Sequence, residues 1–160
     1  MSRIRIDLPS QWLELFGDDG ACIRRYRVST GSRGAGEEKG SYQTPRGRHQ
    51  IRARIGEGAP LGAVFRGRRP TGEVLTPGLA EANPDRDWIL TRILWLSGLE
   101  PGRNRLGSVD TMQRYIYIHG TPDSEPMGEP RSMGCVRMRN CDVAELFDLV
   151  PVGTLVEIEE

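Results

Sequence analysis

The chain of 160 residues has little of what marks several large classes of protein. Its 22 basic and 22 acidic residues cancel, so no overall electric field attracts it to nucleic acid or to a membrane surface. No apolar run approaches the ~20 residues that cross a bilayer. Three cysteines, an odd number, imply no disulfide framework. We therefore expect one globular domain over residues 1–160, with no nucleic-acid partner and no membrane span.

What the chain has in quantity is glycine and proline. Twenty glycines and eleven prolines divide it into short segments, which favours strands and loops over long helices. Strands are predicted at residues 3–8, 12–16, 21–28, 48–55, 114–119 and 153–158. One helix is predicted near residues 141–150, with Asn140 as N-cap and with Cys22 and Cys141 as packed, non-functional thiols. The sequence predicts a mainly β fold, either a β-sandwich or a partly closed barrel of short strands.

One of only two histidines, His119, ends an alternating strand pattern. Because side chains alternate along a strand, Ile116 and Ile118 are predicted to face the core. Tyr115, Tyr117 and His119 then share the opposite face. A glycine follows the histidine, so the imidazole is predicted at the rim of a sheet, where a ligand can approach.

A cysteine, Cys135, follows sixteen residues after His119. A thiol attacks carbonyl groups as the thiolate, which a neighbouring imidazole supplies near neutral pH. The backbone N–H groups around Gly134 can aim at one oxygen, as an oxyanion hole requires. Taken singly, such a cysteine is more often a small buried hydrophobe, and such a histidine a structural or surface group. Together the two residues indicate a cysteine acyltransferase or hydrolase.

These residues resemble the motif of the L,D-transpeptidases, cysteine peptidoglycan transpeptidases unrelated to penicillin-binding proteins. The family pattern is His-Gly, a loop, then Ser/Thr-His-Gly-Cys, a hydrophobic residue and Arg or Asn. The present sequence reads His119-Gly120-Thr121 and then Ser132-Met133-Gly134-Cys135-Val136-Arg137. Similar segments at residues 44–51, 87–92 and 98–100 extend the resemblance to about residues 3–158. By resemblance, residues 87–96 form a strand, and part of residues 66–110 covers the active site as a lid.

The resemblance also implies roles for the motif. Cys135 is the nucleophile, and His119 is the base that takes its proton and later protonates the leaving amine. The backbone carbonyl of Gly120 orients the imidazole. The N–H groups of Gly134 and Cys135 hold the oxyanion, and Ser132 shapes the turn. No metal and no other cofactor is implied.

Three further positions complete the predicted site. Met133 stands where most members of the family have histidine, a departure that concerns substrate fit and pH dependence, while its backbone N–H stays available. Arg137 either holds a substrate carboxylate or braces the loop, since arginine does both. Tyr117, on the strand face of the catalytic histidine, is assigned with Arg137 to substrate binding.

The family's donor substrate is a peptidoglycan stem tetrapeptide. The cysteine attacks the carbonyl on the L-centre of diaminopimelate and expels D-alanine, and carbapenem β-lactams acylate the same thiol. An amine acceptor gives a cross-link, whereas water gives a trimmed tripeptide, the L,D-carboxypeptidase outcome. The implied partners are stem peptides or soluble muropeptides, and the sequence carries no signal for an oligomeric state.

The start of the chain bears on the acceptor. Residues 2–8 alternate as a first strand and contain no apolar core of a signal peptide. If this N-terminus is native, we expect a cytoplasmic enzyme that acts in muropeptide recycling with water as acceptor. If a signal was removed, we expect a periplasmic or cell-envelope enzyme.

Two other functions were weighed. Met133 permits a catalytically inactive relative that binds muropeptides without cleaving them. A zinc site would use His119, Cys135, Cys141 and His49, but structural zinc usually takes paired ligands two to four residues apart, and the sequence has no such pair.

Overall fold

Ten strands form one sheet in the computed structural model, which describes residues 2–160. The strands are β1 (Arg3–Asp7), β2 (Trp12–Phe16), β3 (Cys22–Ser29), β4 (Gly47–Ile55), β5 (Ala63–Arg66), β6 (Arg69–Val74), β7 (Ile89–Gly98), β8 (Tyr117–Gly120), β9 (Val136–Met138) and β10 (Leu155–Glu159). The helices are α1 (Pro77–Ala82), α2 (Asn140–Leu149) and the 3-10 turn η1 (Gly107–Val109).

Eight of these strands close a barrel. They run in the order β4-β10-β1-β2-β3-β9-β8-β7, and β7 pairs back with β4. The predicted mainly β fold is confirmed, and the barrel is closed rather than partly open. Closure removes the exposed sheet edges that would otherwise pair with other chains.

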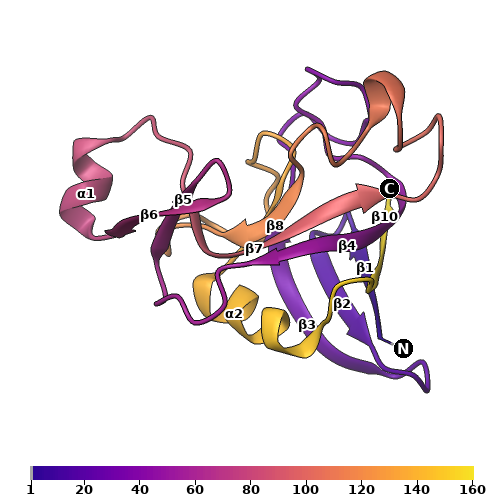
Figure 1. The fold of residues 1–160 in the computed structure, drawn as a ribbon, viewed down its shortest axis with the longest axis horizontal. Coiled ribbons are helices and arrows are strands. Elements are labelled where there is room, and N and C mark those ends of the chain that lie inside the picture. The colour runs from indigo at the N-terminus through magenta and orange to yellow at the C-terminus, as the bar shows by residue number, and fades with distance from the viewer. Residues whose placement is uncertain (1) are drawn as a thin grey trace.

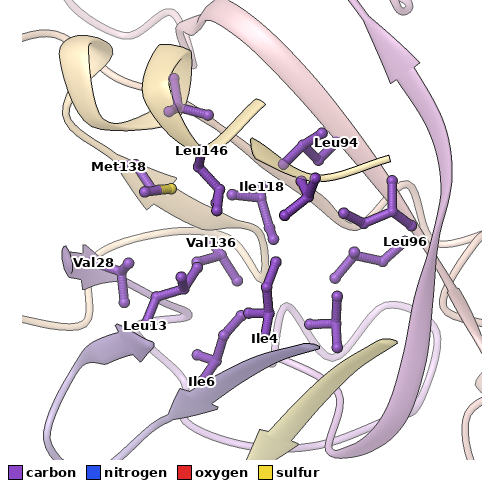
Figure 2. Packing of buried hydrophobic residues seen from close by; sticks show 14 of the residues in the cluster. Ile4, Ile6, Leu13, Val28, Leu94, Leu96, Ile118, Val136, Met138 and Leu146 are labelled. Carbon is purple, nitrogen blue, oxygen red and sulfur yellow. The ribbon is translucent and has the colours of Figure 1, made fainter. Parts of the chain in front are cut away.

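The core fills the barrel and follows from alternation along its strands. In β1, Ile4 and Ile6 are fully buried between partly exposed neighbours, and the other barrel strands send apolar side chains to the same interior. Figure 2 shows these residues converging between the strands and α2. The predicted helical apolar positions of α2 are all buried: Val143, Leu146, Phe147 and Val150. Helix α2 thereby packs against β7 and β8 and holds them in place.

The strands beside the His119 and Cys135 segments are direct neighbours. β8 and β9 pair in parallel, with His119 opposite Arg137. The strand predicted from residue 114 begins only at Tyr117, because Tyr115 adopts a left-handed φ of 58° within a turn. Tyr115 is therefore exposed, while Ile116 and Ile118 enter the core as predicted.

Strands β5 and β6 and helix α1 extend from β7 beside the barrel (Figure 1). They begin just before the glycine- and proline-rich segment at residues 66–110 and continue into it. The sequence predicts only a lid for part of that segment. Helix α1 starts after Thr76, whose Oγ1 accepts the N–H of Leu79 at 3.1 Å, with Pro77 next in line. The predicted strand at residues 87–96 corresponds to β7.

Three local predictions are wrong. The N-cap of α2 is Arg139, so Asn140 is the first helical residue and its side chain is free for other contacts. Cys22 and Cys141 are exposed rather than packed, since each lies at the outer end of its element.

No helix within residues 2–160 is long and apolar enough to cross a membrane.

Candidate active site

A cleft of about 280 Å³ opens where β8 and β9 begin. It is lined by six residues of the predicted site: Tyr117, His119, Ser132, Met133, Cys135 and Arg137. Gly120 and Gly134 are buried directly behind the cleft lining. The fold thus brings together at one site residues that are up to 20 positions apart in the sequence, because β8 and β9 are adjacent.

One hydrogen bond to the backbone fixes the orientation of the His119 imidazole. Its Nδ1 lies 2.6 Å from the carbonyl oxygen of Gly120. Because a carbonyl only accepts, Nδ1 carries the proton in the neutral ring, and Nε2 keeps the lone pair of a base. Burial lowers the pKa of His119, and the bond to Gly120 opposes that shift. The residue is 1% exposed, so its orientation is held tightly.

The thiol of Cys135 lies between two backbone groups. Its Sγ accepts the N–H of Tyr117 at 3.3 Å and donates to the carbonyl of Tyr115 at 3.3 Å. Burial raises the pKa of the thiol, while the Tyr117 N–H and the Arg137 charge act in the opposite direction. Burial of both groups therefore favours a neutral thiol and a neutral imidazole, and the thiolate forms when the proton passes to a base.

The turn that carries Cys135 is braced on both sides. Ser132 Oγ donates to the Cys135 carbonyl at 2.5 Å and accepts the Gly134 N–H at 3.1 Å. Thr44 Oγ1 donates to the Gly134 carbonyl at 3.0 Å. Gly134 has φ +121°, and a Cβ there would lie 3.1 Å from the carbonyl oxygen of Gln43, so only glycine fits. The Gly134 N–H is held by Ser132 in this structure, which leaves the Cys135 N–H as the adjacent donor for an oxyanion.

Arg137 forms an ion pair beside the thiol. Its Nη2 lies 3.1 Å from Oδ1 of Asp87, which precedes β7 and also lines the cleft. Its Nε is buried without a hydrogen-bond partner. The Arg137 guanidinium therefore holds the segment around Asp87 in place, and its Nε–H group donates no hydrogen bond.

A second arginine of the cleft, Arg68, is not among the predicted site residues. It lies in the turn between β5 and β6, donates to the Tyr117 hydroxyl at 3.0 Å and lies 4.9 Å from the ring centre of Trp95 and 4.7 Å from that of Tyr115. No local sequence pattern marks Arg68 as a site residue, because only the folding of the β5–β6 hairpin brings it to the cleft. Of the segment predicted to include a lid, Gly67, Arg68 and Asp87 line the cleft. That part of it covers the site stays a prediction.

The residues of the alternative zinc site are not brought together. His49 is buried in β4, where Nδ1 contacts the Gly47 carbonyl at 3.0 Å and Nε2 the Thr111 hydroxyl at 2.9 Å. Across residues 2–160, no three His, Cys, Asp or Glu side chains gather in a way that could hold a metal ion.

Comparison with known proteins agrees with this geometry. A family model described as the L,D-transpeptidase catalytic domain (YkuD) matches residues 1–158. The probable L,D-transpeptidase ErfK/SrfK of Salmonella typhimurium is 51% identical over 45 residues, which cover 28% of this chain and 15% of that protein. The match thus spans a minor part of that relative's own length.

Solved structures share the fold. The transpeptidase LdtMt1, in complex with imipenem, aligns over 99% of this chain and 58% of its own, with a TM-score of 0.58 and 18% identity. L,D-transpeptidase 3 from Mycobacterium tuberculosis, in complex with a faropenem-derived adduct, aligns over 99% of this chain and 60% of its own, with a TM-score of 0.59 and 16% identity. Because the family model covers nearly its whole length, the chain belongs to the family of L,D-transpeptidase catalytic domains.

Proposed function

We propose that the protein is a cysteine L,D-acyltransferase acting on peptidoglycan tetrapeptides through a thioester on Cys135. The observation that carries this proposal is the 2.6 Å bond from His119 Nδ1 to the Gly120 carbonyl. It leaves Nε2 as a base in the cleft that also holds the thiol. The substrate is assigned from membership of the family, and the bond attacked lies between the L-centre of diaminopimelate and D-alanine.

The first half-reaction forms the thioester. Cys135 Sγ attacks the carbonyl carbon while its proton passes to His119 Nε2. The tetrahedral oxyanion is held by backbone N–H groups of the nucleophile turn, with the Cys135 N–H the donor nearest at hand. When the intermediate collapses, the C–N bond breaks, and the imidazolium gives its proton to the amine of D-alanine.

The second half-reaction regenerates the thiol. His119 Nε2 takes a proton from an acceptor, which attacks the thioester carbonyl and releases the Cys135 thiolate. The imidazolium then returns the proton to sulfur. An amine acceptor yields a cross-link, and water yields a tripeptide. The same residues serve both outcomes.

Two guanidinium groups suit a substrate with free carboxylates. Arg137 and Arg68 both line the cleft, and Arg68 is held over the rings of Trp95 and Tyr115. Tyr117, whose hydroxyl accepts from Arg68, lines the same cleft. We assign these three side chains to substrate binding.

The proposal is tested with a disaccharide-tetrapeptide substrate and mass spectrometry of the products, with and without an added amine. Loss of D-alanine to water alone identifies an L,D-carboxypeptidase, and an amine-exchanged or cross-linked product identifies a transpeptidase. Binding of the tetrapeptide without either product would contradict the proposal and favour the inactive muropeptide-binding relative.

A carbapenem should label the same thiol. Imipenem is expected to add one acyl group per chain, because ring opening by the Cys135 thiol gives a thioester like that of the substrate. Intact-protein mass spectrometry measures the adduct, and peptide mapping locates it. Cys22→Ser and Cys141→Ser proteins serve as controls that keep the adduct, since both thiols are exposed outside the cleft. An adduct that survives in Cys135→Ala would contradict the assignment.

The family's missing histidine should matter little. Met133 is 55% exposed at the cleft rim, so Met133→His is expected to leave kcat/KM within about tenfold, or ~1.4 kcal/mol in the barrier. The backbone N–H is unchanged, and a histidine at this exposed position needs no repacking. Steady-state release of D-alanine measures the effect. A loss of all activity would show that Met133 takes part in the chemistry.

A further inference from the structure

A buried polar cluster lies behind the catalytic histidine, and the proposed mechanism does not use it. Thr91 Oγ1 donates to Asn140 Oδ1 at 2.5 Å and accepts the Gly62 N–H at 3.0 Å. Asn140 Nδ2 donates to the Thr121 carbonyl at 3.0 Å and to Asp123 Oδ1 at 3.2 Å. Thr91 is fully buried and Asn140 is 8% exposed. Burying polar groups this deeply costs free energy unless each group keeps its hydrogen-bond partner.

The cluster touches the peptide that orients the imidazole. A Cβ added to Gly120 would lie 2.4 Å from Asn140 Oδ1 and 2.7 Å from the carbonyl oxygen of Leu90. Gly120 is therefore confined between helix α2 on one side and strand β7 on the other. Its carbonyl is the group that accepts from His119 Nδ1. A movement of the Asn140 amide would displace the Gly120 residue and with it this carbonyl.

The backbone opposite this peptide is irregular. β7 pairs Leu90 with Gly120 and Ile93 with His119, so three steps along β7 correspond to one step along β8. Thr91 lies in this bulge with a φ of 73°, a conformation that a β-branched residue rarely adopts. Bulges and strained residues of this kind occur beside functional sites, where they re-aim a side chain. The strained conformation directs the Thr91 hydroxyl at Asn140.

We propose that Thr91 and Asn140 are positioning residues for His119, which hold the Gly120 carbonyl at the place where it orients the imidazole. The inference rests on the proposed role of His119 as the base. Thr91 fixes the Asn140 amide, the amide clamps the Gly120–Thr121 peptides, and the Gly120 carbonyl fixes the proton on Nδ1. Side chains thus position the histidine indirectly, through the backbone carbonyl of the next residue. Many hydrolases use a carboxylate side chain for this purpose.

The relay predicts a change in pH dependence as well as in rate. The bond to the Gly120 carbonyl raises the pKa of His119 against the effect of burial. If the carbonyl drifts, the pKa of the imidazole falls, and the acid limb of the activity profile moves to lower pH. The rate on the plateau falls too, because Nε2 is a weaker and less well oriented base. Structural damage alone would lower the rate without moving the limb.

The test uses Thr91→Val, which removes the hydroxyl at nearly constant volume, and Thr91→Ser, which keeps it. Thr91→Val is expected to lower kcat about ten- to a hundredfold with KM within about twofold, and to shift the acid limb downward. Thr91→Ser is expected to restore both. Val143→Ala is the control for stability, since it removes a buried contact of α2 outside the polar cluster.

A second readout needs no peptide substrate. Iodoacetamide alkylation of Cys135, followed by peptide mass spectrometry across pH, should show the same slowing and the same shift in Thr91→Val. The exposed Cys22 and Cys141 supply internal rates that should be the same in the variant and the wild type at each pH. This result would support the positioning role even if the tetrapeptide proved to be the wrong substrate.

Two results would overturn the inference. One is a Thr91→Val protein whose Cys135 alkylation matches the wild type at every pH. The other is a uniform slowing with no shift of the limb, as Val143→Ala would give. If Thr91→Val does not fold, Asn140→Leu replaces it, because a leucine side chain of similar shape cannot donate to the Thr121 carbonyl and adds no charge near His119. The same shift is then expected, and an unchanged profile would contradict the relay.

Discussion

Cys135→Ala is expected to abolish release of D-alanine, because Cys135 carries the thiol that lines the cleft and the nearby Ser132 hydroxyl is engaged by the Cys135 carbonyl and the Gly134 N–H. The alanine variant keeps the fold, since the turn is held by Ser132 and Thr44 rather than by the thiol. Liberated D-alanine is measured against the wild-type protein by mass spectrometry. Cys141→Ala, which changes an exposed thiol on α2, is the matched control and should be fully active.

A single outcome would remove the nucleophile assignment. If Cys135→Ala releases D-alanine at more than a trace of the wild-type rate, then water or another group attacks the peptide directly. Thermal unfolding of the variant, measured in parallel, separates this case from loss of the fold. The proposed thioester would then have no place in the reaction.

His119→Ala is expected to lower kcat by about 10²- to 10⁴-fold, the range that general acid–base catalysis supplies. The variant loses both the base that takes the thiol proton and the acid that protonates the leaving amine. Steady-state kinetics across pH provide the measurement, and the acid limb set by the imidazole should vanish. KM should change less than kcat, since the imidazole acts mainly on the reacting atoms.

The chain's second histidine provides the control. His49 is buried and bonded to Gly47 and Thr111, and burial lowers its pKa to about 4. His49→Gln is expected to reduce thermal stability while leaving the limb of the pH profile near neutrality in place. An unaltered limb in His119→Ala, or its loss in His49→Gln, would show that the wrong histidine has been assigned.

Much of the barrel was predictable because its strands alternate. Ile4 and Ile6 fall between polar neighbours in β1. The residue types alternate in the same way over residues 115–119, although every residue of β8 itself is buried. The helix at residues 140–149 was predictable from apolar spacing. The hairpin of β5 and β6 and helix α1 were not, because α1 buries no residue and β6 is largely exposed. Segments without an inward face carry no periodic signal.

The predicted site residues lie together around one cleft, since a two-part motif names residues on adjacent strands. The sequence did not identify Arg68 and Asp87, which reach the cleft from a turn and a loop. Asn140 was interpreted as an N-cap because its residue type favours that position. Its actual contacts, with Thr91 and Thr121, depend on how β7 and β8 pair, which local sequence does not reveal.

The thioester is tested most directly by trapping it on the wild-type protein. A disaccharide-tetrapeptide is mixed with the enzyme without an amine acceptor, quenched in acid within the first turnover and analysed by intact-protein and peptide mass spectrometry. We predict a mass increase equal to the tetrapeptide substrate less D-alanine, on the peptide that contains Cys135. Release of D-alanine with no acyl group on Cys135 at any quench time, or an acyl group on another residue, would contradict the mechanism.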